Sequence, residues 1–255
     1  MAKAVAKKDQ NELTKDSLAM MQEDAGQGMD FGKDDLAIPF IRICQATSPQ
    51  RKKKDPKYIE GIEDGHLFNT VLEVSYGEEV RVIPVAYEKV YNEWIDRDEG
   101  GGFVATYPTA QEAAENAAPE NDVVETANHY VLIQDPNTGA WSQAIVTLKS
   151  SGLKVSRKWN SMVSMRKVDG PNGPFTPPAY AQVFTLSTVE ESNDLGDWWN
   201  FQVKPDCLVP ELPNGEQVYQ DAKDFRNLIQ EGAARADFRK YEPESDLDED
   251  DNPDF

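Results

Sequence analysis

The order of apolar and polar positions divides most of the chain into strands. Segments of β-branched and aromatic residues, several of them alternating with polar ones as in a strand with one buried face, are separated by turn residues such as Gly77 and the run 135–139. The pattern predicts strands over 35–44, 65–76, 79–95, 123–135, 140–149, 179–190 and 197–205. In the third of these, the even positions from Val80 to Trp94 are expected to form one apolar face.

A helical repeat replaces this pattern between Ser151 and Lys167. One side of the predicted helix is apolar and the other is basic, with Lys154, Arg157, Lys158 and Ser161. A second helix is predicted to begin in a capping box at Asn214 and Gln217. It carries an apolar stripe of Val218, Ala222, Phe225 and Ile229, which suits a helix on the edge of a sheet.

These elements predict a mainly β fold with flanking helices (α+β). Three strands, a helix and two further strands follow the chain order of an oligonucleotide/oligosaccharide-binding (OB) fold, a five-stranded barrel with a helix between strands 3 and 4. Residues 100–122 are expected to form a linker with a short helix over 111–118. We expect a flexible arm over 1–34, a domain over 35–239 with the C-terminal helix at its end, and a disordered acidic tail over 240–255.

Charge is distributed very unevenly along the chain. The 255 residues include 46 acids and 26 bases, for a net charge of −20. Eight acids and no base lie between Glu242 and Phe255, whereas no acid at all lies between Asp135 and Asp169. The acid-free window contains the basic side of the predicted helix. A separate basic run in a Pro-flanked loop consists of Arg51, Lys52, Lys53 and Lys54. Clustered bases in an acidic protein indicate contacts with phosphate, although solvated turns and helix faces account for such runs as well.

Aromatic side chains accompany the bases. Tyr87, Lys89 and Tyr91 share a face of the third strand, an arrangement in which rings stack on unpaired bases and the ammonium meets a phosphate. The candidate DNA-binding residues are Tyr87, Lys89, Tyr91, Trp141, Lys149, Lys154, Arg157, Lys158, Trp198, Lys204, Arg51, Lys52, Lys53 and Lys54. We expect them to converge along one groove. Ordinary cross-strand and edge packing is the alternative for the aromatic residues.

Enzymatic chemistry has little support in the sequence. Cys44 and Cys207 are too few for a disulfide framework, and neither His66 nor His129 has metal-ligand spacing around it. We therefore expect no catalytic residue, metal or cofactor. With no signal peptide or membrane-spanning run, the expectation is a cytoplasmic protein that does not bind membranes.

The acidic end of the chain has two physical uses. It can lie over a basic groove, or it can offer its terminal phenyl ring and carboxylate to a partner's pocket. The residues concerned are Asp246, Asp248, Glu249, Asp250, Asp251, Asp254 and Phe255. This end resembles the C-terminal tip of bacterial and phage single-stranded DNA-binding proteins, which recruits replication and repair partners. It departs from the bacterial pattern because Asp254 separates Pro253 from Phe255.

The body of the chain also resembles phage proteins assigned to single-stranded DNA binding. The resemblance lies in the runs 35–39 (DLAIP), 57–61 (KYIEG), 68–71 (FNTV) and 82–87 (VIPVAY). It implies a protein that coats unpaired DNA during phage replication, recombination or repair in the host bacterial cytoplasm. The partners expected are single-stranded DNA and replication or recombination proteins docked on the tail. Association of the chain into a homo-oligomer is a further option. An annealing mediator, a virion or scaffolding protein without DNA binding and, with least support, an enzyme are the alternatives.

Overall fold

The computed structural model describes residues 20, 21, 23, 24, 38–194 and 196–238. The chain divides into a unit of Met1–Leu36 and a unit of Ala37–Phe255. In the first unit, residues 20, 21 and 23 are helical. All that follows concerns the second unit.

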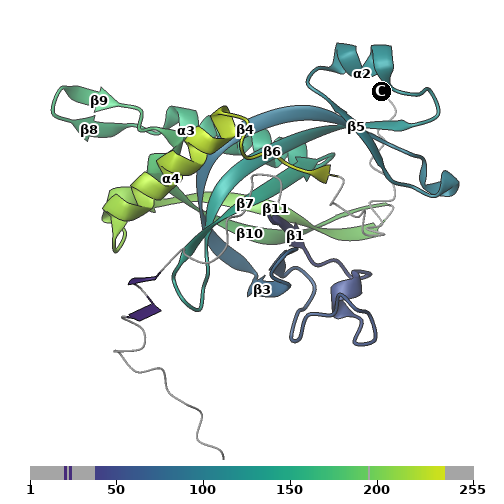
Figure 1. The fold of residues 1–255 in the computed structure, drawn as a ribbon, viewed down its shortest axis with the longest axis horizontal. Coiled ribbons are helices and arrows are strands. Elements are labelled where there is room, and N and C mark those ends of the chain that lie inside the picture. The colour runs from purple at the N-terminus through teal and green to yellow at the C-terminus, as the bar shows by residue number, and fades with distance from the viewer. Residues whose placement is uncertain (1–19, 22, 25–37, 195, 239–255) are drawn as a thin grey trace, which may run out of the picture. The chain divides into compact units, whose positions relative to one another are not determined.

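The second unit is mainly β with flanking helices, which confirms the predicted class. Nine of the eleven strands between residues 38 and 238 form one sheet that curls into a half-barrel (Figure 1). The strands are β1 Phe40–Ile43, β2 Leu67–Asn69, β3 Val74–Gly77, β4 Glu79–Trp94, β5 Phe103–Tyr107, β6 Asp122–Gln134, β7 Trp141–Lys149, β8 Val168–Gly170, β9 Gly173–Phe175, β10 Gln182–Asn193 and β11 Gly196–Leu208. The sheet is therefore larger than the five strands expected.

The order of strands in this sheet is β11-β10-β4-β6-β7-β1-β2-β3, with β5 also paired to β4. Every pairing is antiparallel except that of β1 with β7. Strands β4, β6 and β7 are adjacent in the sheet, although β5 and α2 separate β4 from β6 in the chain, while β10 and β11 extend the sheet from the other edge of β4. Strands β8 and β9 form a separate hairpin.

Three α-helices accompany the strands in the described part of the second unit: α2 Ala110–Asn116, α3 Gly152–Met165 and α4 Gly215–Gln230. Short 3-10 segments cover Pro49–Arg51, Arg97–Glu99, Ala179–Ala181 and Val209–Glu211. Helix α3 lies in the chain between β7 and β10. Helices α3 and α4 agree closely with the two helices predicted from the sequence, and α2 with the short one.

Two hydrophobic clusters occupy the two faces of the sheet. The first, which we call the α3 cluster, joins Val82, Val131 and Val146 of the sheet to Trp159 of α3. The second, the α4 cluster, joins sheet residues such as Ile83 to Val218, Ala222 and Phe225 of α4. Because its apolar stripe packs against the sheet face, α4 covers that face rather than an edge.

One bulge changes which residues of β4 face each cluster. The register between β4 and β6 shifts between Pro84 and Ala86, at a proline that has no N–H to donate to the ladder. Val80 and Val82 belong to the α3 cluster, whereas Ala86 and Trp94 pack against the α4 cluster. The expectation of one continuous face of even positions was therefore wrong, because a bulge reverses the alternation.

Other differences are local. The segment 65–76 was expected to be one strand, but the turn at 70–73 divides it into β2 and β3, and Glu73 there has a φ of 53°. The expected linker over 100–122 contains strand β5. Asn214 does precede α4, but its φ is 55° and its side chain makes no capping hydrogen bond, so the predicted capping box was wrong.

Candidate nucleic-acid interface

Helix α3 is held against the sheet by a buried histidine. His129 Nε2 lies 2.8 Å from the Ser156 hydroxyl, and the His129 ring stacks on Trp159 with 4.4 Å between centroids and 8° between planes. Burial lowers the pKa of His129 to about 3, so the imidazole is neutral at neutral pH. This contact fixes the buried side of α3 and therefore sets which residues of the helix face solvent.

The cations of α3 lie on its solvent side, as the helical repeat predicted. Lys154, Arg157 and Lys158 are all exposed. Lys154 Nζ forms an ion pair with Glu191 of β10 at 2.9 Å. Within the described part of the chain, Arg157 and Lys158 form no ion pair. These two residues are therefore the cations of α3 whose charge is least compensated.

The start of α3 is attached to the β10–β11 hairpin. The Asn200 side-chain amide donates to the Ser151 hydroxyl at 3.2 Å and to the Glu191 carboxylate at 2.9 Å. Burial alone would raise the pKa of Glu191, but the hydrogen bonds from Asn200 and Lys154 outweigh it and lower the pKa. Glu191 therefore stays ionised and keeps Lys154 close to the hairpin.

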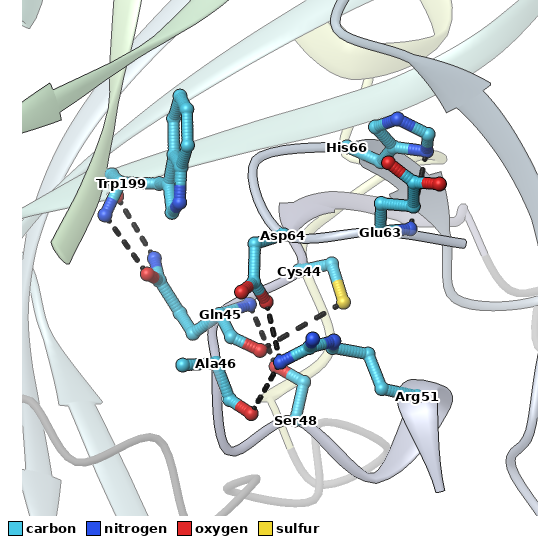
Figure 2. Close-up of polar contacts among 9 residues, drawn as sticks. All are labelled: Cys44, Gln45, Ala46, Ser48, Arg51, Glu63, Asp64, His66 and Trp199. Atoms are coloured by element: carbon cyan, nitrogen blue, oxygen red, sulfur yellow. Dashed lines mark hydrogen bonds and ion pairs between the residues drawn. The ribbon is translucent and has the colours of Figure 1, made fainter. Parts of the chain in front are cut away.

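The loop between β1 and β2, which carries the basic run at 51–54, is attached to Trp199 of β11, the residue next to Asn200. The Gln45 side-chain amide donates to the Trp199 carbonyl at 2.8 Å, and its oxygen accepts from the Trp199 N–H at 2.9 Å (Figure 2). Thr188 adds a hydrogen bond to the Gly65 carbonyl at 2.7 Å. Gly65 has a φ of 78°, and a Cβ there would lie 2.8 Å from the Trp199 ring, so only glycine suits this close approach.

The loop that carries one basic run and the start of the basic helix α3 thus attach to adjacent residues of β11, through Gln45 at Trp199 and through Ser151 at Asn200. Lys52, Lys53 and Lys54 are exposed in the loop. Arg51 instead forms an ion pair with Asp64 at 2.7 Å and donates to the Ala46 carbonyl (Figure 2). The guanidinium therefore stabilises the loop, and Lys52, Lys53 and Lys54 are the exposed cations of this run that form no ion pair within the described residues.

We call Tyr87, Lys89 and Tyr91 of β4 the Tyr87 strip. It lies on the same sheet face as α3. Tyr87 is 47% exposed, and its ring centroid lies 5.1 Å from that of His129, the residue that holds α3. Lys89 lies over the Tyr91 ring and forms an ion pair with Glu125 at 3.4 Å. The hydrogen bond with Tyr91 and the attraction of Glu125 raise the pKa of Lys89. The Lys89 charge is therefore partly compensated.

The structure separates two predicted residues from this strip. Trp141 packs against the α4 cluster, on the opposite face of the sheet. Lys149 alternates with Leu148 of the α3 cluster and so also faces the α4 side. The expectation that Trp141 and Lys149 join Tyr87 in one groove was wrong, because alternation along β7 directs both of them to the other face.

The last strand shows the predicted alternation. Val203 is buried in the α3 cluster, against which Trp199 and Phe201 pack. Trp198 is half-buried opposite Glu191, and Lys204 is exposed opposite Thr185. Because both alternate with residues of the α3 cluster, neither lies on the sheet face that carries Tyr87, and the expectation that they join it in one groove was also wrong. The predicted tail residues 246–255 lie outside the described residues.

The sequence reasoning missed Gln45, Ser156 and the structural role of His129. His129 occupies the same strand face as Ala127 and Val131, which are both buried. The strand pattern was therefore enough to predict that the His129 side chain points into the core. No local signal marks Gln45, because its partner lies 154 positions away.

Two further findings concern metals and membranes. Among the residues that the structure describes, no group of three or more His, Cys, Asp or Glu side chains is placed to hold a metal ion. Within the same residues, none of the helices combines the length and the apolar character needed to cross a membrane.

Comparison with known proteins identifies the family of the chain. No curated protein and no solved structure matches the chain. The model of one family matches residues 7–235, which include every described element from β1 to α4. The chain therefore belongs to the Pam3 phage gp34-like protein family.

Proposed function

We propose that this phage protein binds single-stranded DNA, with α3 at the centre of the interface. The observation that carries the proposal is the outward direction of Arg157 and Lys158, fixed by the contact of His129 with Ser156 and Trp159. Trp159 of α3 stacks on His129, whose ring also contacts Tyr87. Ser151 at the start of α3 accepts a hydrogen bond from Asn200, next to the residue that holds the lysine loop. Rings then stack on unpaired bases while the cations neutralise phosphates, which gives binding with little sequence preference.

The topology supports the same proposal. Strands β4, β6 and β7, helix α3, and strands β10 and β11 occur in the chain order of an OB barrel, and their pairing places β10 beside β4. The parallel strand β1 lies beside β7 and contacts β11, where the first and last parts of a barrel would meet. OB folds commonly bind oligonucleotides, although the fold alone does not determine function.

The acidic tail completes the proposed mechanism. With DNA absent, residues 246–255 would compete for the cations of the interface, and DNA would release them to bind a replication or recombination protein. This role rests on charge in the sequence and on the resemblance of the tail to those of single-stranded DNA-binding proteins.

The test is titration of a fluorescent oligothymidine at two salt concentrations. Tyr87→Ala should weaken binding by about 5-fold or more with little change in salt dependence, because stacking is lost. Lys158→Ala should reduce the slope of log affinity against log salt by about 0.7, the value for one phosphate contact on a single strand.

Matched variants control for surface changes. Lys223→Ala removes an exposed cation of α4, on the other side of the sheet, and should leave the slope unchanged. Tyr87→Phe should keep most of the affinity because it retains the ring. Failure of the wild-type protein to bind the oligonucleotide at low salt would refute the proposed function.

A further inference from the structure

The β8–β9 hairpin projects from the end of α3 (Figure 1) and contributes no residue to the three hydrophobic clusters formed by the residues that the structure describes. Its two strands of three residues are joined by Pro171 and Asn172. Phe175 is 47% exposed on the hairpin, and Met165 at the end of α3 is 75% exposed. The hairpin therefore presents apolar surface to solvent without stabilising the core.

Both ends of the hairpin are nevertheless anchored. On the side of α3, the Arg166 guanidinium donates to the carbonyls of Cys207 and Asp206, both at 3.2 Å. On the other side, the fully buried Gln182 amide donates to the carbonyls of Pro177 and Val163, both at 3.1 Å. These four hydrogen bonds fix the base of the hairpin to β11 and α3.

The Phe175 ring is held in place on the hairpin surface. Phe175 pairs with Val168 across the two strands, and a Cβ on Gly170 would lie 2.9 Å from its ring. The ring therefore covers the bare backbone of Gly170, an arrangement in which an aromatic ring shields a strand glycine. Because the ring is already ordered, stacking a flat ligand on its exposed face costs little conformational entropy.

The charge of the surrounding segment favours an anionic ligand. Residues 136–189 contain six bases and a single acid, Asp169, in a chain with 46 acids. Lys167 is exposed beside the hairpin and its ammonium group donates to the Thr176 hydroxyl at 2.7 Å. An exposed ring next to a cation matches the base and phosphate of an unpaired nucleotide.

We propose that Phe175 stacks on an unpaired nucleobase, so that the hairpin extends the path of the DNA strand beyond α3. In Figure 1 the hairpin and β5 lie on opposite sides of the molecule's second unit. Strand β5 pairs with β4 from Tyr91 onwards, at the end of the Tyr87 strip. Because Trp159 of α3 stacks on His129 beside Tyr87 and the hairpin follows the end of α3, a strand that runs from the Tyr87 strip to the hairpin follows α3. This inference rests on the proposed function and adds a second stacking site to it.

Phe175→Ala tests the inference in the full-length protein. Binding is measured by fluorescence anisotropy with oligothymidines of about 6 and about 30 nucleotides, since one OB fold covers roughly 4–16. We expect Phe175→Ala to lose about 5-fold or more in affinity for the longer strand and less for the shorter one, and Phe175→Trp to retain wild-type affinity. Leu72→Ala, which truncates another exposed apolar side chain at a hairpin turn, should change neither affinity.

The outcomes separate the two proposals. If the wild-type protein binds neither oligonucleotide, the proposed function fails. If it binds both and Phe175→Ala binds equally well at unchanged thermal stability, the hairpin inference is overturned while the proposed function stands. An equal loss with Leu72→Ala would also overturn the inference, because the effect would then not be specific to the Phe175 ring.

Discussion

At the scale of single residues, His129 has the greatest structural consequence. Its ring lies between Tyr87 and Trp159, and its Nε2 contacts Ser156, so one side chain joins the β4 strip to α3. The side chain is almost fully buried, and burial therefore strongly favours the neutral imidazole. Protonation of His129 would place an uncompensated charge in the core.

This gives a pH-dependent prediction for stability. The pKa of His129 falls from 6.5 to about 3 on folding, so its contribution is fully present above pH 6.5 and is lost as the pH falls towards 3. Between pH 6.5 and 5, the wild-type protein should lose about 2 kcal/mol of unfolding free energy more than His129→Gln, at about 1.4 kcal/mol per pH unit. Urea unfolding at several pH values measures this. Parallel pH profiles for the two proteins would show that His129 does not titrate as described.

At the scale of elements, the β1–β2 loop is attached to β11 by a side chain that acts as a strand partner. Gln45 satisfies both the N–H and the carbonyl of Trp199, two backbone groups on the outer edge of the sheet. A third cluster, which includes Ile59, Ile62 and Phe68, packs within this region. The loop is therefore a folded element whose base is fixed to β11.

Gln45→Ala should release this loop. It removes both hydrogen bonds to Trp199, and the unpaired backbone groups should cost about 1–3 kcal/mol. Hydrogen exchange should accelerate at the Trp199 amide and across residues 44–66, while the β6–β7 pair stays protected. Gln143→Ala, at an exposed glutamine of β7, serves as the control and should leave exchange unchanged. Slow exchange at the Trp199 amide in Gln45→Ala would mean that other contacts hold the loop.

At the scale of the whole molecule, the arrangement of charge matters more than the net charge. A chain of −20 can bind DNA only where its bases are exposed and uncompensated. Several predicted cations are paired in the structure: Lys89 with Glu125, Arg51 with Asp64 and Lys154 with Glu191. These carboxylates compete with phosphate for the same cations.

Neutralising one of these acids should therefore strengthen binding. Glu191→Gln frees the ammonium of Lys154 for phosphate, so the affinity for oligothymidine should rise several-fold and the salt slope should steepen by about 0.7. Glu190→Gln makes the same charge change at the adjacent exposed position, where no ion pair with Lys154 is present. Oligonucleotide titration across a salt series compares the two variants. Equal effects would indicate that only net charge matters.

The sequence by itself determined the type and approximate bounds of most elements. Alternation predicted β4, β6, β7, β10 and β11, and the helical repeat predicted α3 with its cations outward, because these patterns are local. Short elements such as β5 and the β8–β9 hairpin escaped prediction, since three to five residues with Gly and Pro nearby also suit a loop.

Only the tertiary structure decided which predicted residues lie together. The bulge at Pro84–Ala86 reversed the faces of β4, and strand alternation placed Trp141 and Lys149 across the sheet from Tyr87. The sequence likewise gave no sign that Gln45 and Ser151 meet β11 at adjacent residues. Local patterns report the burial of each residue, whereas neighbours in space depend on strand order and register, which are set by contacts between distant segments.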